Sequence, residues 1–255
     1  MMRETTCYLY DGSFEGLLTA IFEAFTCREQ SIRIASEKGL QHNLLERYVT
    51  VETDLEKAKR VYRSILNKIS RNALDNVYRV YLADREEDNA GIIFEYLKFG
   101  WKVGARVDSY LSDDRVLRVH KIRQRVDLEV HRMMGFVRFR LLQGGIYYAP
   151  IEPDNDILTL LAPHFSKRFA DQSWVIHDVG RDRAALYNKK EWIIVDARLE
   201  KIPEADDSEQ TYQELWKHFY NSVTIKERFN PGLHKRLLPK RYWRYLIEKD
   251  GIHGI

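Results

Sequence analysis

Cysteine is scarce in this sequence, and its scarcity excludes several kinds of site. The chain has 255 residues and two cysteines, Cys7 and Cys27. Two thiols at this spacing cannot form a zinc site with four cysteine ligands or a cysteine-ligated iron–sulfur cluster. We therefore expect this chain to hold no such cofactor, and we expect both thiols to be buried and reduced.

Long apolar runs are missing as well. No stretch approaches the ~20 apolar residues that a membrane-spanning helix requires. The first residues, MMRETTCYLYDG, also lack the continuous apolar core of a signal peptide. These two absences predict a cytoplasmic protein without a membrane segment.

The general motifs of nucleotide-binding and hydrolytic enzymes are absent too. The sequence contains neither the phosphate-binding pattern GxxxxGK[ST] nor the dinucleotide-binding pattern GxGxxG. It also lacks GxSxG, HExxH and the HxE…PCxxC pattern of zinc deaminases. If this protein is an enzyme, its active site is therefore not one that these general motifs identify.

The composition that remains is that of an ordinary globular protein with a local excess of cations. Hydrophobic residues make up 44% and charged residues 31%, and the net charge is +3. Residues 225–249 nevertheless carry eight Lys or Arg against two Glu. A local basic excess of this kind is typical of proteins that bind a phosphate backbone.

Hydrophobic periodicity predicts an α+β protein. Residues 1–112 are expected to be mostly helical with a short strand pair, and 113–201 to hold a basic helix and a mostly antiparallel sheet. The order in that sheet unit is strand-strand-helix-strand-strand-strand, flanked by helices. Residues 202–255 are expected to form a C-terminal helix and a basic tail, and the three parts could also make one continuous domain.

Local signals refine these elements. The spacing of Thr53 and Glu56 predicts a capping box, and Asp154 or Asp156 is expected to cap a helix that Pro163 breaks in two. "QGG" at 143–145 predicts a hairpin turn in which Gly145 has a positive φ.

The predicted helix over 115–134 is amphipathic and strongly basic. Its apolar stripe is Val119, Ile122, Val126, Val130 and Met133. A polar stripe on the same helix, His120, Gln124, Asp127 and His131, allows two interpretations. Asp127 and His131 could share a metal or a proton, or the whole stripe could be a solvated surface.

A second group of polar residues surrounds the predicted hairpin. Its members with acid–base chemistry are His131, Glu152, Asp154, His164 and His177. Glu152 and Asp154 lie at a strand-to-helix junction, where functional side chains are common. Structural ion pairing explains this group about as well as a catalytic site does. Because His177 and Asp178 alternate along a strand, at most one of them can join a given site.

The stretch "LLPKRYWRYL" at 237–246 interleaves cations with aromatic rings. Such a pattern is typical of chains that lie against nucleic acid, where cations meet phosphates and rings stack on bases. The same pattern also fits a tail that packs its rings on its own domain. We expect Trp243 to anchor the tail, Tyr242 to stay free to stack, and Lys240, Arg241 and Arg244 to face outward.

Several stretches together resemble a bacterial family of uncharacterised proteins described as DNA repair or DNA metabolism proteins, which carry a domain of unknown function. The stretches run in the expected order from Tyr8 to about Leu246: YDGSFEGLLTAIFEAF, HRMMGFVRFR, YYAPIEPDNDILTLLAPHF, WVIHDV and IKERFNPGLHKRLLPKRYWRYL.

The resemblance implies a cellular context rather than a reaction. Members are typically encoded beside a radical SAM protein, and in some bacteria the domain is fused to a uracil-DNA glycosylase. An iron–sulfur cluster and S-adenosylmethionine would then belong to the partner. The glycosylase part is missing here, so base excision is not carried over to this chain.

Two hypotheses follow. In the first, the chain is a DNA-binding accessory that works with a radical SAM or uracil-DNA glycosylase partner, with phosphates bound by cations and bases stacked on two rings. The expected contact residues are Arg132, Arg138, Arg228, Lys240, Arg241, Tyr242, Trp243 and Arg244. In the second, His131, Glu152, Asp154, His164 and His177 form a site that acts directly on a DNA base or backbone.

Overall fold

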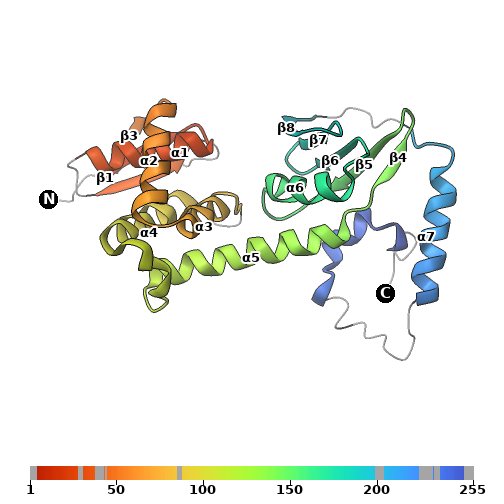
Figure 1. Cartoon of the computed structure of the whole chain (residues 1–255). Coiled ribbons are helices and arrows are strands. Elements are labelled where there is room, and N and C mark those ends of the chain that lie inside the picture. Colours follow the sequence, from red (N-terminus) through yellow and green to blue (C-terminus); the bar gives the residue numbers. More distant parts are fainter. Residues whose placement is uncertain are drawn as a thin grey trace. The chain divides into compact units, whose positions relative to one another are not determined.

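The computed structural model describes residues 5–27, 31–37, 43, 45–84, 88–198, 204–223, 232 and 236–249 (Figure 1). The chain divides into two compact units, Met1–Asp127 and Leu128–Ile255. The predicted α+β class is confirmed, because each unit combines one sheet with helices.

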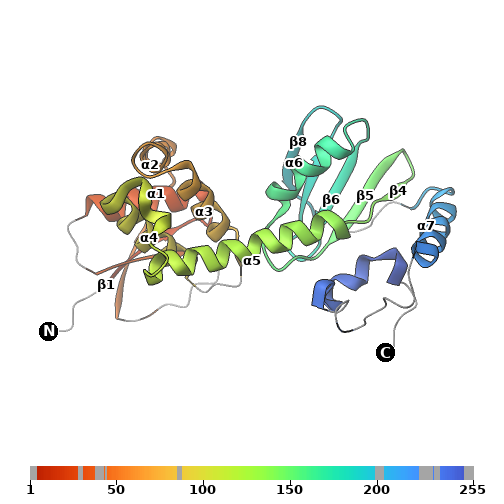
Figure 2. The ribbon, with the colours of Figure 1, turned by 60° about the horizontal axis from the view of Figure 1, so that its bottom comes forward.

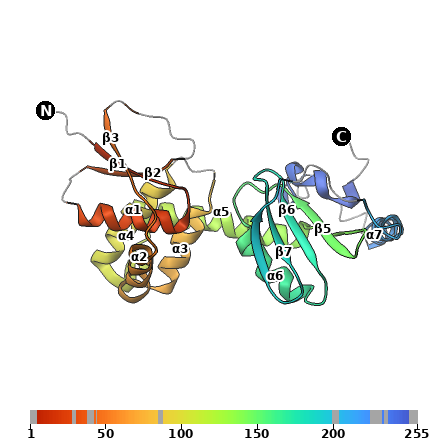
Figure 3. The same cartoon turned by 90° about the horizontal axis from the view of Figure 1, so that it is seen from above.

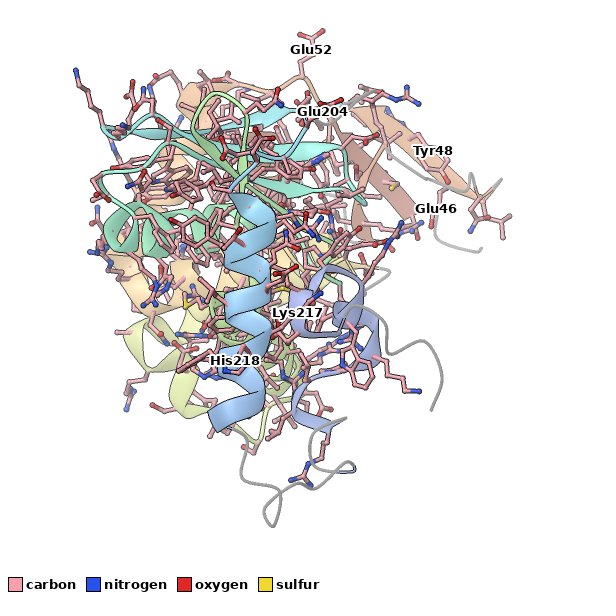
Figure 4. The ribbon with its side chains drawn as sticks, turned by 90° about the vertical axis from the view of Figure 1, so that its right-hand side faces the viewer. Glu46, Tyr48, Glu52, Glu204, Lys217 and His218 are labelled. Atoms are coloured by element: carbon pink, nitrogen blue, oxygen red, sulfur yellow. The ribbon has the colours of Figure 1, made fainter. Side chains whose placement is uncertain are left out.

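The sheet of the first unit is parallel. Its central strand is β1 (Thr5–Tyr10), with β2 (Ile32–Ser36) on one side and β3 (Glu46–Thr50) on the other. The sequence predicted β1 and β3 but missed β2, so the expected strand pair is a three-stranded sheet. An ion pair of 3.0 Å between Arg33 and Glu46 joins the two outer strands, and Figure 4 labels Glu46 on β3.

Helices pack against this sheet and against one another. They are α1 (Phe14–Thr26), α2 (Leu55–Lys68), α3 (Arg71–Tyr81), α4 (Asn89–Val103) and the 3₁₀ helix η1 (Gly104–Ser109). α1 contacts β1, β2 and α2, while α4 contacts β2 and α3 (Figure 3). The predicted helical segments of this part are thus confirmed.

The capping box predicted at Thr53 is wrong by one residue. Asp54 is the N-cap of α2, and its carboxylate accepts from the backbone N–H groups of Glu56 and Lys57. The Thr53 hydroxyl instead donates to Asp11 at 2.9 Å. Aspartate caps as well as threonine does, so the tertiary contact of Thr53 decides which residue is used.

The long basic helix is α5 (Asp114–Phe136). Its predicted apolar stripe is confirmed, because Val119, Ile122, Val126, Val130 and Met133 are all buried. The boundary between the units falls within this helix, after Asp127. The helix therefore supplies residues to the core of each unit.

The second unit contains a five-stranded mixed sheet. Its strands are β4 (Arg140–Leu142), β5 (Ile146–Ile151), β6 (Trp174–Asp178), β7 (Arg183–Tyr187) and β8 (Trp192–Asp196), in that spatial order. All neighbours are antiparallel except β5 and β6, which are parallel. The sheet is thus mostly antiparallel, as predicted, and the order of elements is confirmed.

The β4–β5 hairpin turns at a glycine pair. Gly144 and Gly145 have φ angles of +91° and +77°, which confirms the positive φ predicted for Gly145. β4 begins only at Arg140. Arg138 therefore lies before the strand rather than on one of its faces.

The helix after β5 differs from prediction at both its start and its middle. α6 (Leu158–Arg168) begins after Ile157 without a side-chain cap and continues through Pro163. Buried Leu161, Ala162 and Phe165 hold the helix together on both sides of the proline. Neither Asp154 nor Asp156 caps it, because both carboxylates bind arginines.

The last described elements are α7 (Glu209–Val223), η3 (Lys240–Tyr245) and η4 (Ile247–Lys249). α7 runs through the foreground of Figure 4, where Lys217 and His218 are labelled. Its first residue, Glu209, accepts a 2.8 Å hydrogen bond from the backbone N–H of Leu141 in β4.

Two expectations about residue environment can be compared with the structure. Cys7 is buried, whereas Cys27 is partly exposed, and both are free thiols. In the part of the chain that the structure describes, no helix combines the length and the apolar character needed to cross a membrane.

Candidate functional site on the second unit

The candidate site lies where β5 and β6 end. These two strands run parallel, with Ile151 beside Asp178, so the segments that follow them leave the sheet at the same edge. The carboxyl ends of parallel strands are frequent places for ligand sites. Glu152 and Asp154 follow β5 at this edge.

The 3₁₀ helix η3 (Lys240–Tyr245), the main part of the tail, contacts β5 (Figure 3). η3 is a 3₁₀ helix, and because such a helix has about three residues per turn, residues i and i+3 lie on the same side. Its six residues therefore form three pairs: Lys240 with Trp243, Arg241 with Arg244, and Tyr242 with Tyr245.

The tyrosine pair holds the segment in place. Tyr242 is 4% exposed, and its hydroxyl donates to the buried carboxylate of Glu129 at 2.5 Å. Burial and this hydrogen bond raise the pKa of the Tyr242 phenol well above its ordinary value. The expectation that Tyr242 stays free to stack on a base is therefore wrong for this structure, because its ring is in the core.

Glu129 is the centre of the contact. It also accepts from the backbone N–H of Asp154 at 2.7 Å, and from both the backbone and the side-chain amide of Asn155. A buried carboxylate is costly unless it is hydrogen-bonded, and these four donors offset that cost. Glu129 thus links α5, the segment after β5 and the tail.

The arginine pair faces the two acidic residues after β5. Arg241 forms an ion pair with Asp154 at 2.6 Å, and Arg244 forms one with Glu152 at 3.3 Å. The Tyr245 hydroxyl also donates to Glu152, at 3.2 Å. The Arg241 and Arg244 side chains remain 43% and 70% exposed, so the prediction that they face outward is confirmed.

The third pair joins the ammonium group of Lys240 to the ring of Trp243, 5.9 Å from its centroid. Trp243 is partly exposed, and its indole N–H donates to the backbone carbonyl of Leu238 at 3.0 Å. Trp243 therefore contributes only in part to attaching the tail to the unit. Tyr242 is the buried ring that the sequence analysis expected Trp243 to be.

Arg138, expected to contact DNA, is engaged inside the unit. Its guanidinium binds Glu248 at 2.7 Å and lies 5.2 Å from the centroid of the Trp216 ring. Glu248 is almost fully buried. Burial alone would raise the pKa of Glu248, but hydrogen bonds from Arg138, from its own backbone N–H and from Trp216 hold that pKa below its ordinary value.

A buried tyrosine–histidine pair lies on the tail-covered face of the sheet. Tyr148 on β5 and His177 on β6 are joined by a 2.7 Å hydrogen bond between the phenol and Nδ1. Burial raises the pKa of Tyr148 to about 12, and nearby Tyr245 adds to the shift. His177 is 4% exposed, and its Nε2 has no hydrogen-bond partner among the described residues.

Asp178 points to the opposite face, as alternation along the strand requires. There it pairs with Arg181 at 2.7 Å. Burial raises the pKa of Asp178, and the nearby Arg181 opposes the shift. Asp156, whose charge adds to the rise in that pKa, pairs with Arg183.

The structure does not bring the five expected acid–base residues together. Glu152, Asp154 and His177 lie around the tail, whereas His131 is exposed on α5. His164 is on α6, where its ring packs edge-on against Phe165. Phe165 contacts Trp174, which lies three residues before His177 and so on the other face of the sheet.

The remaining expected residues are placed as follows. The Arg132 guanidinium lies 3.5 Å from the backbone carbonyl of Arg236, and Arg228 lies outside the described residues. On the polar stripe of α5, Asp127 binds Arg79 and Arg123, and His120 binds Asp108 at 3.0 Å. Two members of the stripe are thus held by partners in the first unit, Asp127 by ion pairs and His120 by a hydrogen bond.

Sequence reasoning missed Glu129, Tyr148 and Tyr245. One signal was present for Glu129, because it lies three residues after Val126 and next to Val130, beside the apolar stripe of α5. A carboxylate at such a position predicts a buried partner. Tyr148 and Tyr245 lie in stretches that carry the family resemblance, but nothing in the sequence assigned either residue a role.

The comparisons with known proteins bear on residues 87–248. A search of curated proteins finds no significant match to the chain. The family model described as a domain of unknown function, DUF4130, matches residues 87–248, which include α4, α5, the whole second sheet and the tail through Glu248. Because this match covers more than half of the sequence, the chain belongs to the DUF4130 family.

Proposed function

We propose that this protein is a nucleic-acid-binding accessory of DNA repair or DNA metabolism. In this proposal it contacts DNA phosphates through the tail surface, which we define as Arg132, Lys240, Arg241 and Arg244. Trp243, which is partly exposed, is the ring that we assign to a base.

The observation that carries the proposal is the way the tail is fixed. Tyr242 is buried while Lys240, Arg241 and Arg244 are exposed around it. A fixed backbone with exposed cations binds phosphates without first having to be ordered, which lowers the cost of binding.

The carboxylate that pairs with Arg244 does not prevent this role, because the side chains of Arg244 and Glu152 are both exposed. Ion pairs between exposed side chains typically contribute only ~0–1 kcal/mol, so a phosphate can replace Glu152 beside Arg244. Two residues that the sequence assigned to DNA are not part of this proposal. Tyr242 is buried, and Arg138 is bound to Glu248.

The partner in this proposal is a radical SAM protein or a uracil-DNA glycosylase, on the strength of the resemblance described above. A radical SAM partner would supply the iron–sulfur cluster and S-adenosylmethionine. The pair would act in the cytoplasm on DNA that this chain helps to hold.

The test is salt-dependent binding of a labelled DNA duplex and a labelled single strand. We expect the triple substitution of Lys240, Arg241 and Arg244 by Ala to weaken binding and to flatten the dependence of log affinity on log salt. The matched control is the triple substitution of Lys167, Arg168 and Lys190, which are exposed cations of the same unit. Equal effects of the two triples, or no binding at low salt, would refute the tail surface.

The partner is tested separately. The full chain is co-expressed with a radical SAM protein of the kind that is typically encoded beside members of the resembling family, and the complex is isolated through a tag on one component. DNA exposed to each protein alone and to the pair is then compared by mass spectrometry. Recovery of neither a complex nor a joint product would remove the partner from the proposal.

The Tyr148–His177 pair supports a second candidate, an enzyme that acts on a DNA base or backbone. A buried histidine with one ring nitrogen bonded to a phenol and the other unpaired among the described residues resembles a group held for proton transfer. We expect His177→Gln to abolish such an activity while DNA binding persists. A product that survives this substitution would exclude His177 from the chemistry.

A further inference from the structure

The first unit contains a groove that the proposed function does not use. It lies between α1, α2 and α4 and has a volume of about 600 Å³, and these three helices can be followed in Figure 2. A volume of this size is typical of ligand-binding clefts. The described residues that line it are Phe22, Phe25, Thr26, Arg60, Val61, Arg63, Ser64, Asn67, Lys68 and Trp101.

The floor of the groove is aromatic and held in place. Phe25 is 44% exposed, and its ring meets the Trp101 ring edge-on, with 4.7 Å between centroids. The indole N–H of Trp101 donates to the Ser64 hydroxyl at 3.0 Å. The rings are therefore oriented before any ligand arrives, and an exposed ring in such a place offers its face to a flat partner.

The rim of the groove is cationic. Arg60, Arg63 and Lys68 project from α2, and none of the described lining residues is acidic. Carboxylates on the neighbouring helix faces already have lysine partners, since Glu23 binds Lys57 and Glu56 binds Lys59. Among the described lining residues the rim thus has a net positive charge beside an apolar floor.

The ligand that matches this combination is both flat and anionic. A nucleobase stacks on an aromatic ring, and the phosphates beside it bind arginine and lysine. Arg60 and Lys68 are eight residues apart, roughly 12 Å along a helix at 1.5 Å per residue. This is more than one phosphate group can span, so the rim fits a strand better than a mononucleotide.

We propose that this groove binds single-stranded nucleic acid, with an unstacked base on the ring of Phe25, which Trp101 supports edge-on, and successive phosphates on Arg60, Arg63 and Lys68. The bases of a duplex are stacked and paired, so they cannot reach the floor. The site is distinct from the tail surface, and of its residues only Trp101 lies within the family match.

The proposal is tested on the full chain with a fluorescently labelled eight-nucleotide thymidine strand. Phe25→Ala should weaken binding about 5- to 160-fold, which corresponds to the loss of one stacked base. The control is Tyr110→Ala, which removes another partly exposed ring of the same unit. Equal losses in the two variants would overturn the proposal.

The cations have a matched control too. Replacing Arg60 and Arg63 by Ala should flatten the salt slope by about 1.4, at ~0.7 for each single-strand phosphate contact. Replacing Lys59 and Arg106, which are exposed but do not line the groove, should leave the slope unchanged. A slope that responds equally to both pairs would indicate general charge attraction and would refute the groove.

A photo-crosslink locates the contact directly. A strand with 4-thiothymidine is irradiated with the protein, and the modified peptides are identified by mass spectrometry. We expect modification at residues 22–26 or at Trp101. Crosslinks confined to residues 128–255 would overturn the groove while leaving the tail surface in place. Competition by thymidine monophosphate at the concentration of the strand would show a nucleotide site instead, and would overturn the assignment to a strand.

Discussion

The phenol of Tyr242 donates a 2.5 Å hydrogen bond to the carboxylate of Glu129, 113 residues earlier in the chain. Through this contact the C-terminal segment is attached to α5 and, by the other donors to Glu129, to the segment that follows β5. The tail of the second unit is therefore a folded part of the unit with charged side chains on its surface.

Removing this hydrogen bond should destabilise the second unit. We expect Tyr242→Phe to lower the free energy of unfolding by about 1.5–3 kcal/mol, because a buried carboxylate loses one of its donors. Urea unfolding followed by tryptophan fluorescence measures the effect, since four of the five tryptophans lie after residue 128.

The matched control is Tyr245→Phe, which removes a contact to the exposed side chain of Glu152. Its expected effect is below about 1 kcal/mol. Similar losses for the two substitutions would contradict the central place given to Glu129.

Arg138 and Arg244, two of the arginines that were expected to bind DNA, should differ sharply in how much their removal lowers stability. Arg138→Ala leaves the carboxylate of Glu248, 4% exposed, without its cation, and should cost about 3–5 kcal/mol. Arg244→Ala breaks an exposed pair and should cost ~0–1 kcal/mol. The measurement is the urea midpoint of each variant, with the slope of the transition used to check that the same surface unfolds. An Arg138 variant as stable as the Arg244 variant would show that the buried ion pair is not needed.

Much of the fold could be predicted because the residues that the sequence pattern assigns to the core are the ones that the structure buries. The apolar stripe of α5 and the Gly144–Gly145 turn were both visible in the sequence. β2 was missed because five residues between polar segments carry little periodicity. The parallel pairing of β5 and β6 was also hidden, since alternation is the same in parallel and antiparallel strands. The α6 segment between them was the available signal, because parallel strands need a long crossover.

The candidate site was harder to predict because contacts distant in sequence form it. Three-residue turns in η3 place Tyr242 and Tyr245 on the same side, whereas α-helical spacing suggested that Trp243 would be the anchor. Glu129 acquires its role from donors at 154, 155 and 242, which no local pattern connects. His131 and His164 looked like partners of His177 only because all three share the same chemistry, and the fold does not bring them together.

The hairpin glycines offer a test of backbone conformation. Gly145 has a φ of +77° and nothing lies within 4 Å of the place where a Cβ would be. We therefore expect Gly145→Ala to cost about 1–2 kcal/mol through the left-handed backbone alone. Gly135 is in α5 and also has open space around it, so Gly135→Ala should stabilise by about 0.5–1 kcal/mol. Thermal unfolding shows whether each variant is more or less stable than the wild type. A Gly145→Ala variant as stable as the wild type would contradict the turn conformation.

Asp178 should make the stability of the second unit depend on pH in an unusual direction. Its carboxyl is fully buried, and burial raises its pKa in the folded state above the ordinary value of ~3.9. Below ~pH 3.9 the group is protonated in both states, so its contribution to stability is complete. As the pH rises through the raised pKa, the folded state must ionise a buried group, and that stability is lost. Asn at this position has no proton to lose, so the free energy of unfolding of Asp178→Asn relative to the wild type should increase as the pH rises from ~3.9 through the raised pKa.

Asp206 provides a control, because its pKa is shifted in the direction opposite to that of Asp178. Hydrogen bonds from the hydroxyl and backbone N–H of Ser208 lower the pKa of Asp206. Its carboxylate therefore stabilises the fold above ~pH 3.9, and that stability is lost as the pH falls through the lowered pKa. The relative stability of Asp206→Asn should thus decrease as the pH rises, whereas that of Asp178→Asn increases. Urea unfolding at several pH values measures both variants, and parallel curves for the two would show that burial of Asp178 does not oppose its ionisation.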